Sequence, residues 1–171
     1  MAYSFEAIAT DQTPSEARAS EYVLGHGDRI RVTVFGHEDL SGEFLVSENG
    51  TIAMPLVGVL DFSGATVREA QEMVVEALKP DYLLNPRVSV EVLEYRPFYI
   101  IGEVNNPGPY PYVSGMTVRE AVALGGGFTY RARTNRVMII RATDDTRTES
   151  PIPVTDEVLP GDVVRVTERF L

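Results

Sequence analysis

The chain has 171 residues, of which 44% are apolar, and this is enough for the core of one ordinary domain or of two small ones packed together. Its 15 lysines and arginines against 25 acids give a formal charge of −10, which disfavours nucleic acid as a partner because phosphates are bound through cationic side chains. It has no cysteine and no run of about 18 apolar residues, which excludes disulfides, thiolate metal sites, a cysteine nucleophile, a lipidated cysteine and a membrane-spanning helix within these residues.

The first residues are predicted to form a leader that is followed by strands. No apolar period is visible near the start, so we expect a flexible leader over residues 1–20. Apolar residues then alternate over 30–34, as in a strand with one buried face. Asn49-Gly50 predicts a tight hairpin between the strand before it and a returning strand over 51–56, because both central residues of such a turn need positive φ.

A helix and a further strand complete the first half of the chain. Thr66 and Glu69 have the spacing of a capping box, in which each side chain accepts a hydrogen bond from the other residue's backbone N–H. Apolar residues recur at helical spacing over 67–78, so one stripe of this helix should pack on the sheet, and Pro80 ends it. The alternation over 88–92 predicts the strand that follows.

The second half is predicted to repeat this plan after a module boundary at Arg96-Pro97. Residues 98–104 have the composition of a strand, and the proline and glycine within 106–109 suit a type II turn. The closing strands are predicted over 137–141 and 163–167.

Two repeated sequence patterns indicate that the two halves of the chain are related. The pentapeptide Thr-Val-Arg-Glu-Ala occurs at 66–70 and at 117–121, each time at a predicted helix start. The pattern Gly-Asp-x-x-Arg-Val-Thr occurs at 27–33 and again at 161–167. Three glycines at 125–127 should end the second helix through a left-handed terminus. Because repeated units usually bury their apolar faces against a neighbour, the two repeated patterns predict two related modules.

Several segments resemble the export domain of bacterial outer-membrane polysaccharide export proteins. They are Tyr22–Ile30, Val46–Ile52, Pro55–Gly58, Gly64–Thr66 and Asn85–Val88. Gly102–Tyr110 and Thr117–Gly127 are similar to the soluble-ligand-binding β-grasp (SLBB) module that follows this domain in the same family. The resemblance implies an α+β fold of two small mixed sheet-plus-helix modules, the second β-grasp-like. It implies an export domain over 21–95 and an SLBB domain with a C-terminal strand over 96–171.

The same resemblance implies a function. Members of the family are periplasmic proteins associated with the outer membrane, often through a lipid anchor, and their protomers form a ring or conduit for capsule polysaccharide or exopolysaccharide. The implied partners are polysaccharide, further copies of the chain, an inner-membrane polysaccharide copolymerase and an outer-membrane β-barrel, without nucleic acid. The implied role is non-enzymatic and needs no cofactor.

The chain differs from the longest members of that family. It has one β-grasp module and no C-terminal amphipathic helix, so we do not expect this chain alone to cross the outer membrane. The last residues, Pro160–Leu171, resemble the natural end of short members.

No residues have the spacing of a catalytic or metal site. His26 and His37 lack the His-Glu-x-x-His spacing that places two ligands on one helical face. Adjacent acids at 38–39 and 144–145 point opposite ways in an extended chain, so they cannot flank one bond. The glycines at 125–127 follow a helix, which favours a cap over a phosphate cradle. We therefore expect no catalytic, cofactor-binding or metal-binding residues.

Tyrosines and a cationic run are the candidates for recognition. Five of the eight tyrosines lie between residues 95 and 130, and their rings and hydroxyls suit sugar stacking and protein interfaces, although ordinary core packing also explains them. The run over 130–136 is cationic within an acidic chain and could meet carboxylates of a glycan or of a protomer, or be a solvated loop. The candidate glycan or protomer-interface contacts are Tyr99, Asn105, Asn106, Tyr110, Tyr112, Tyr130, Arg131, Arg133 and Arg136.

Two other functions compete with an export ring. One is a monomeric carbohydrate-binding module, in which the tyrosine-rich β-grasp unit holds a glycan end. The other is a glycan hydrolase that uses acid and base catalysis, and only the abundance of carboxylates favours it.

Overall fold

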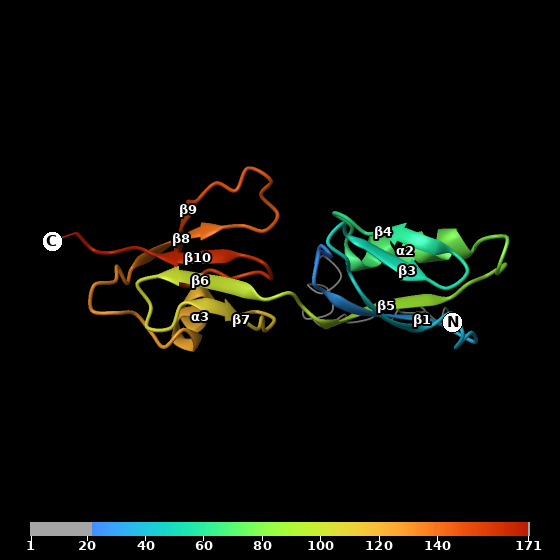
Figure 1. Ribbon diagram of the computed structural model, residues 1–171, viewed down its shortest axis with the longest axis horizontal. Coiled ribbons are helices and arrows are strands. Elements are labelled where there is room, and N and C mark those ends of the chain that lie inside the picture. Colours follow the sequence, from blue (N-terminus) through green and yellow to red (C-terminus); the bar gives the residue numbers. More distant parts are fainter. Residues whose placement is uncertain (1–21, 171) are drawn as a thin grey trace, which may run out of the picture.

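The computed structural model describes residues 22–170, so the leader predicted over 1–20 lies outside the described residues. Figure 1 shows two sheet-and-helix modules side by side along the long axis, joined by the passage from β5 to β6. Each module has its own cluster of buried apolar side chains. The predicted α+β class is confirmed. The first module contains β1 (Arg29–Val34), β2 (Gly42–Leu45), β3 (Thr51–Met54), β4 (Gly58–Asp61), α2 (Val67–Leu78) and β5 (Val88–Glu94).

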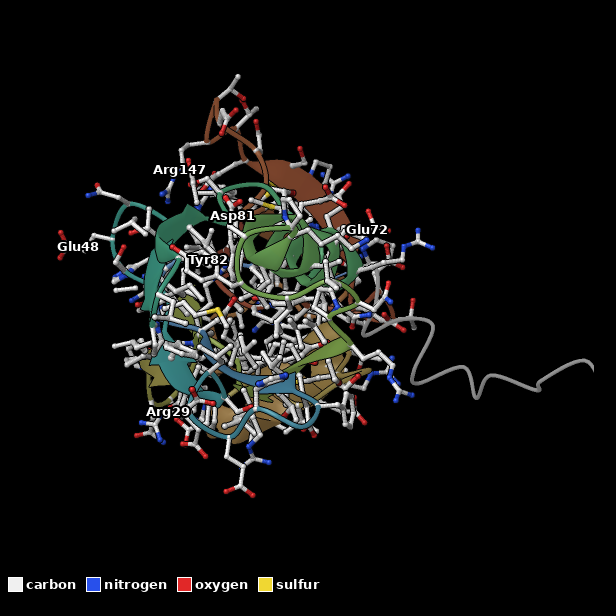
Figure 2. All side chains as sticks on the ribbon, turned by 90° about the vertical axis from the view of Figure 1, so that its right-hand side faces the viewer. Arg29, Glu48, Glu72, Asp81, Tyr82 and Arg147 are labelled. Atoms are coloured by element: carbon white, nitrogen blue, oxygen red, sulfur yellow. The ribbon has the colours of Figure 1, made fainter. Side chains whose placement is uncertain are left out.

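A three-stranded sheet and a separate strand pair form the first module. The sheet has the order β2-β1-β5, and β1 is antiparallel to both neighbours. β3 and β4 pair antiparallel with each other. Alternate residues of β1 are buried, as the sequence predicts for a strand with one face on the core. Seen from the free end of this module, charged side chains such as Arg29 and Glu48 lie at its periphery (Figure 2).

The second module is a five-stranded mixed sheet with a short helix. Its sheet has the order β7-β6-β10-β8-β9, in which β6 and β10 run parallel. The helix contributes Val118, Ala121 and Val122 to the second core. The elements are β6 (Phe98–Gly102), β7 (Gly108–Tyr110), α3 (Val118–Leu124), β8 (Arg136–Ile140), β9 (Ser150–Pro153) and β10 (Val163–Val166).

Both helices begin with the predicted capping box. The N–H of Glu69 donates to Thr66 Oγ1 at 3.2 Å, and the N–H of Thr66 donates to the Glu69 carboxylate at 2.8 Å. Thr117 and Glu120 make the same reciprocal pair, at 3.3 and 2.8 Å. The repeated pentapeptide is therefore a repeated helix start. The left-handed ending of α3 is also confirmed, because the glycines at 126 and 127 have φ of 83° and 85°.

The predicted pairing across the Asn49-Gly50 turn is wrong. The turn forms, since Gly50 has φ of 77° and its N–H donates to the Ser47 carbonyl at 2.9 Å. However, β2 before the turn pairs with β1, and β3 after it pairs with β4. The backbone of Val46 is hydrogen-bonded to the turn before β1. Its N–H donates to the carbonyl of Asp28 at 2.9 Å, and its carbonyl accepts from the N–H of Gly27 at 3.1 Å. A further backbone hydrogen bond crosses the turn, from the N–H of Ser47 to the carbonyl of Thr51 at 2.9 Å, but β2 and β3 do not continue this pairing.

The predicted type II turn at 106–109 is also wrong. Gly108 already belongs to β7 and has φ of 151°, far from the value of about +80° that the turn needs. The connection from β6 instead depends on Gly102, which has φ of 89°. A Cβ at this position would lie 2.1 Å from the Val166 carbonyl oxygen, so only glycine fits where the end of β6 meets β10.

Prolines occupy both edges of the second sheet. β9, which the sequence did not predict, is one edge strand and contains Pro151 and Pro153. β7 is the other edge strand and contains Pro109. Proline has no N–H to donate to a further strand, so these edges are poor places for a sheet to grow.

In the described part of the chain, neither helix has the length and hydrophobicity that crossing a membrane requires.

Candidate functional site at the junction of the two modules

The repeated pattern Gly-Asp-x-x-Arg-Val-Thr places one buried acid in each of two matching turns. Asp28 and Asp162 are 0% and 1% exposed, and each follows a glycine of positive φ. Asp28 Oδ2 accepts from the N–H of Gly25 at 2.8 Å, and Asp162 Oδ2 accepts from the N–H of Leu159 at 2.8 Å. In both turns the donor lies three residues before the acid, so the two copies share one local geometry.

Each buried acid also binds the end of a distant strand and an arginine. The backbone N–H of Arg96 donates to Asp28 Oδ1 at 2.8 Å, and that of Ala142 donates to Asp162 Oδ1 at 3.0 Å. The guanidinium of Arg96 lies 3.5 Å from Asp28, and that of Arg141 lies 2.7 Å from Asp162. Both carboxylates are therefore fully engaged as structural acceptors.

Arg96 lies between the two turns and connects the modules. A Cβ on Gly25 would lie 1.6 Å from its Nη1, and a Cβ on Gly161 would lie 2.6 Å from its Nε. Its guanidinium thus packs directly on the backbone of one glycine from each module. The next residue, Pro97, accepts a hydrogen bond from the N–H of Gly161 at 3.0 Å, and the N–H of Tyr99 donates to the Asp162 carbonyl at 2.8 Å.

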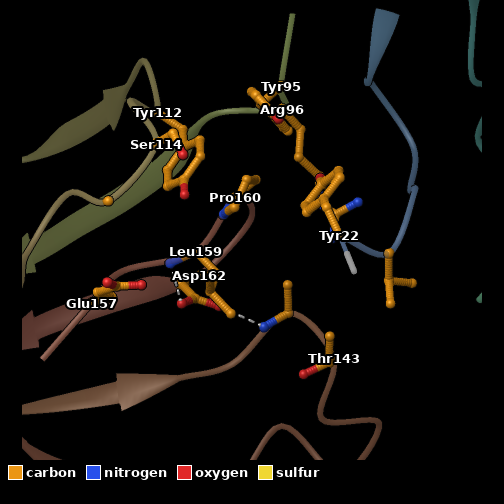
Figure 3. A pocket seen from close by; sticks show the side chains of 13 residues that line it. Tyr22, Tyr95, Arg96, Tyr112, Ser114, Thr143, Glu157, Leu159, Pro160 and Asp162 are labelled. Atoms are coloured by element: carbon orange, nitrogen blue, oxygen red, sulfur yellow. Dashed lines mark hydrogen bonds between the residues drawn. The ribbon is translucent and has the colours of Figure 1, made fainter. Parts of the chain in front are cut away.

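Three tyrosines continue this junction into a cavity of about 450 Å³, which we call the tyrosine cavity (Figure 3). The rings of Tyr22 and Tyr95 meet edge to face with centroids 4.9 Å apart, and those of Tyr95 and Tyr112 do so at 5.2 Å. Leu159 and Pro160 of the second module also line the cavity. The site is therefore assembled from both modules.

The tyrosine hydroxyls differ in their environments. The hydroxyl of Tyr22 donates to Asp28 at 2.9 Å. Burial, followed by the negative charge of Asp28, raises the pKa of Tyr22 far above its usual range. Burial and the neighbouring Tyr112 also raise the pKa of Tyr95. Both groups thus stay protonated and neutral at physiological pH.

A larger hollow of about 980 Å³, which we call the polar groove, adjoins the tyrosine cavity. The two share four lining residues, so they lie around the same short segments of chain. The shared residues are Val23, Arg96, Ala142 and Thr143. The wall of the polar groove adds amide, hydroxyl, charged and aromatic groups, among them Asn49, Ser63, Tyr99, Asp145 and Arg147.

Comparison with known families accounts for most of the chain. Residues 16–93 match the model described as polysaccharide biosynthesis/export protein, and residues 97–153 match the SLBB domain model. The chain belongs to the polysaccharide export family. The two matches meet at the segment that contains Arg96, so the tyrosine cavity lies where the two family domains of this chain join.

Curated relatives of this chain carry names from polysaccharide production and transport. The exopolysaccharide production protein ExoF of Rhizobium meliloti is 40% identical over 125 residues, which cover 66% of this chain and 30% of ExoF. The EPS I polysaccharide export outer membrane protein EpsA of Ralstonia nicotianae is 27% identical, with 93% of this chain and 50% of EpsA covered. The polysialic acid transport protein KpsD of Escherichia coli is 27% identical, with 72% and 22% covered. The chain thus spans at most half the length of these relatives.

The structure divides the predicted contact residues among separate places. Tyr112 lines the tyrosine cavity, while Tyr99, which is 43% exposed, lines the polar groove. Tyr110 packs on Phe98 and donates its hydroxyl to the backbone carbonyl of Asn106. Asn105 donates its side-chain amide to the carbonyl of a glycine that follows α3, at 2.7 Å. Tyr110, Asn105 and Asn106 therefore stabilise the corner beside α3.

The cationic run lies apart from the junction. Tyr130 is 84% exposed, and Arg131 forms an ion pair with Glu168 near the C-terminal end. Arg133 donates to the Asn135 side chain at 3.3 Å, and Arg136 is the exposed first residue of β8.

Sequence reasoning missed most of the junction. Tyr22 comes from the segment before β1, and no spacing in the sequence relates it to Tyr95 or Tyr112. The repeated Gly-Asp pattern was a signal for the two acid-centred turns, but not for the cavity beside them. Among residues 22–170, no three or more histidines or acids gather as a metal ion would require.

Proposed function

We propose that this chain is a non-enzymatic component of a machine that exports capsule polysaccharide or exopolysaccharide through the periplasm and the outer membrane. The observation that carries the proposal is the ordered match of an export domain and an SLBB domain over residues 16–153. The names of the relatives, which come from exopolysaccharide production and polysaccharide transport, support the same process.

In this function the chain works by shape. Copies of the chain meet through head-to-tail contacts, and the rotation from each copy to the next closes them into a ring. The ring leaves a hydrated passage for the polymer. The formal charge of −10 supports a passage that does not hold an anionic polymer tightly. The two buried acids support a structural role, because their oxygens are engaged by backbone and arginine donors and are not free to transfer protons to a substrate.

The proposed partners follow from this place in the process. They are the polysaccharide, further copies of the chain, an inner-membrane polysaccharide copolymerase that delivers the polymer, and an outer-membrane component that releases it. The proposed location is the periplasm beside the outer membrane.

Deletion of the gene in its host tests the export role. We expect the deletion strain to lose extracellular polysaccharide and to regain it when the chain is supplied from a plasmid. Unchanged extracellular polysaccharide in the deletion strain would reject the proposal. Incubation of the purified chain with the host polymer should also leave the polymer length unchanged, because the role is non-enzymatic.

Size measurement tests the ring. Light scattering at high protein concentration, together with cross-linking in cells that contain the copolymerase, should detect closed oligomers. A monomer under all these conditions would reject the ring. A monomer that binds saccharide, in a strain whose export does not depend on it, would instead indicate the carbohydrate-binding module.

A further inference from the structure

The tyrosine cavity is lined by several neutral hydroxyls, together with the acids Glu157 and Asp162 and the guanidinium of Arg96. Its buried acid, Asp162, is neutralised by Arg141, and Arg96 is paired with Asp28. Four hydroxyls of the lining make no hydrogen bond to another group within residues 22–170. They belong to Tyr95, Tyr112, Ser114 and Thr143.

We propose that the tyrosine cavity binds one or two sugar rings of the exported polysaccharide. Rings with hydroxyl handles match a sugar, because they cover its apolar C–H face and exchange hydrogen bonds with its hydroxyls. The volume of about 450 Å³ lies within the range of about 300–1,000 Å³ that small-molecule sites occupy. This inference rests on the proposed export function for the identity of the polymer.

The form of the two hollows points to a segment within the polymer, not to a chain end. The polar groove adjoins the tyrosine cavity through four shared residues, so a saccharide that fills the cavity has a continuous path into the groove. Along that path the Asn49 amide and the exposed ring of Tyr99 offer further contacts of the same chemistry. A peptide strand would need an unpaired sheet edge, whereas this cavity is lined by residues of turns and strand ends.

Binding at this place would connect the two modules. Tyr22 and Tyr95 belong to the first module or to its boundary, while Tyr112 and Leu159 belong to the second. A bound sugar ring therefore contacts both modules and favours the mutual orientation in which the cavity is formed.

The test uses tetra- to hexasaccharides made by partial hydrolysis of the host's own exopolysaccharide. Calorimetry measures their affinity for the chain, and NMR measures which tyrosine ring signals shift. We expect Tyr112→Ala to weaken binding at least tenfold and Tyr112→Phe, which keeps the ring, to weaken it less. Tyr82→Ala is the matched control, because this tyrosine is 47% exposed, lies outside both hollows and is not among the candidate glycan contacts, so the affinity of this variant should equal that of the wild type.

A second variant covers the case in which Tyr112→Ala disturbs folding. Ser114 is exposed at the rim of the cavity, so Ser114→Trp should obstruct the cavity without removing a core contact. Absence of binding by the wild type, or equal binding by Ser114→Trp, would overturn the inference.

Export assays separate the inference from the proposed function. If gene deletion stops export but the Ser114→Trp chain restores it and binds saccharide as the wild type does, the function stands and the cavity assignment fails. If saccharide binds in the cavity but deletion leaves export unchanged, the binding site stands and the export role fails.

Discussion

Replacing Asp28 with asparagine should remove a large part of the stability of the first module. The carboxylate is 0% exposed and accepts from the N–H of Gly25 at 2.8 Å, the N–H of Arg96 at 2.8 Å and the hydroxyl of Tyr22 at 2.9 Å. The guanidinium of Arg96 adds a fourth contact at 3.5 Å. The asparagine side chain has the same shape but only one acceptor oxygen. Its NH₂ group would take the place of the other carboxylate oxygen and face N–H and O–H donors.

The magnitude follows from the contacts that are lost. If the amide oxygen takes the place of Oδ1, the N–H of Gly25 loses its acceptor and the guanidinium loses its counter-charge. A hydrogen bond to a charged group contributes about 1.5–3 kcal/mol, and breaking a buried ion pair costs about 3–5 kcal/mol. We therefore expect Asp28→Asn to lower the free energy of unfolding by about 3–5 kcal/mol, a large share of the roughly 5–15 kcal/mol typical of a folded domain.

Urea unfolding followed by far-UV circular dichroism measures this loss. Asp162→Asn, in the matching turn, should lower the stability of the second module by a similar amount. Comparing the amide hydrogen-exchange rates of β1 with those of β10 shows which module each substitution destabilises. The exposed Asp39→Asn is the surface control and should change stability by less than about 0.5 kcal/mol. A loss below about 1 kcal/mol for Asp28→Asn would refute the view that this carboxylate organises its turn.

Three further predictions test the same structure. The raised pKa of Tyr22 means that the folded state keeps its proton while the unfolded chain ionises above pH of about 10, so the wild type should lose about 1.4 kcal/mol through this residue by pH 11. The free energy of unfolding, measured at pH 8 and pH 11, should therefore fall less in Tyr22→Phe than in the wild type. An equal fall in both proteins would contradict this prediction. Gly102→Ala should cost more than about 3 kcal/mol in urea unfolding because its Cβ would meet the backbone of β10, whereas Gly36→Ala, also at positive φ but with nothing within 4 Å, should cost only about 1–2 kcal/mol. Thr66→Ala and Thr117→Ala should each lower the melting temperature through the loss of about 1 kcal/mol of capping, and no shift in either would argue against the boxes.

The features that sequence predicted well are local. The boxes at Thr66 and Thr117 were predictable because the two partners lie three residues apart and need no tertiary context. The apolar stripe of α2 was predictable for the same reason, since helical spacing alone selects Ala70, Val74 and Leu78. The repeated Gly-Asp pattern indicated a shared structure, although it did not reveal that both acids are buried.

The features that sequence failed to predict depend on distant partners. Asn49-Gly50 has the composition of a hairpin turn, but the pairing was decided by the backbone of Val46, which is held by the turn before β1. The tyrosine cavity brings together residues that are far apart in the sequence, such as Tyr22, Tyr112 and Asp162. Only the packing of one module on the other creates it, so neither periodicity nor spacing could locate it.

The prolines at the rims of the second sheet set a condition on how copies of this chain can meet. Extension of β7 or β9 by a neighbouring strand is disfavoured, because Pro109, Pro151 and Pro153 have no amide hydrogen to donate. If copies of the chain meet at these edges, the contact has to be made by side chains, whose fit depends on orientation. Edges of this kind disfavour open-ended fibre growth by strand addition, and they remain compatible with an assembly of limited size.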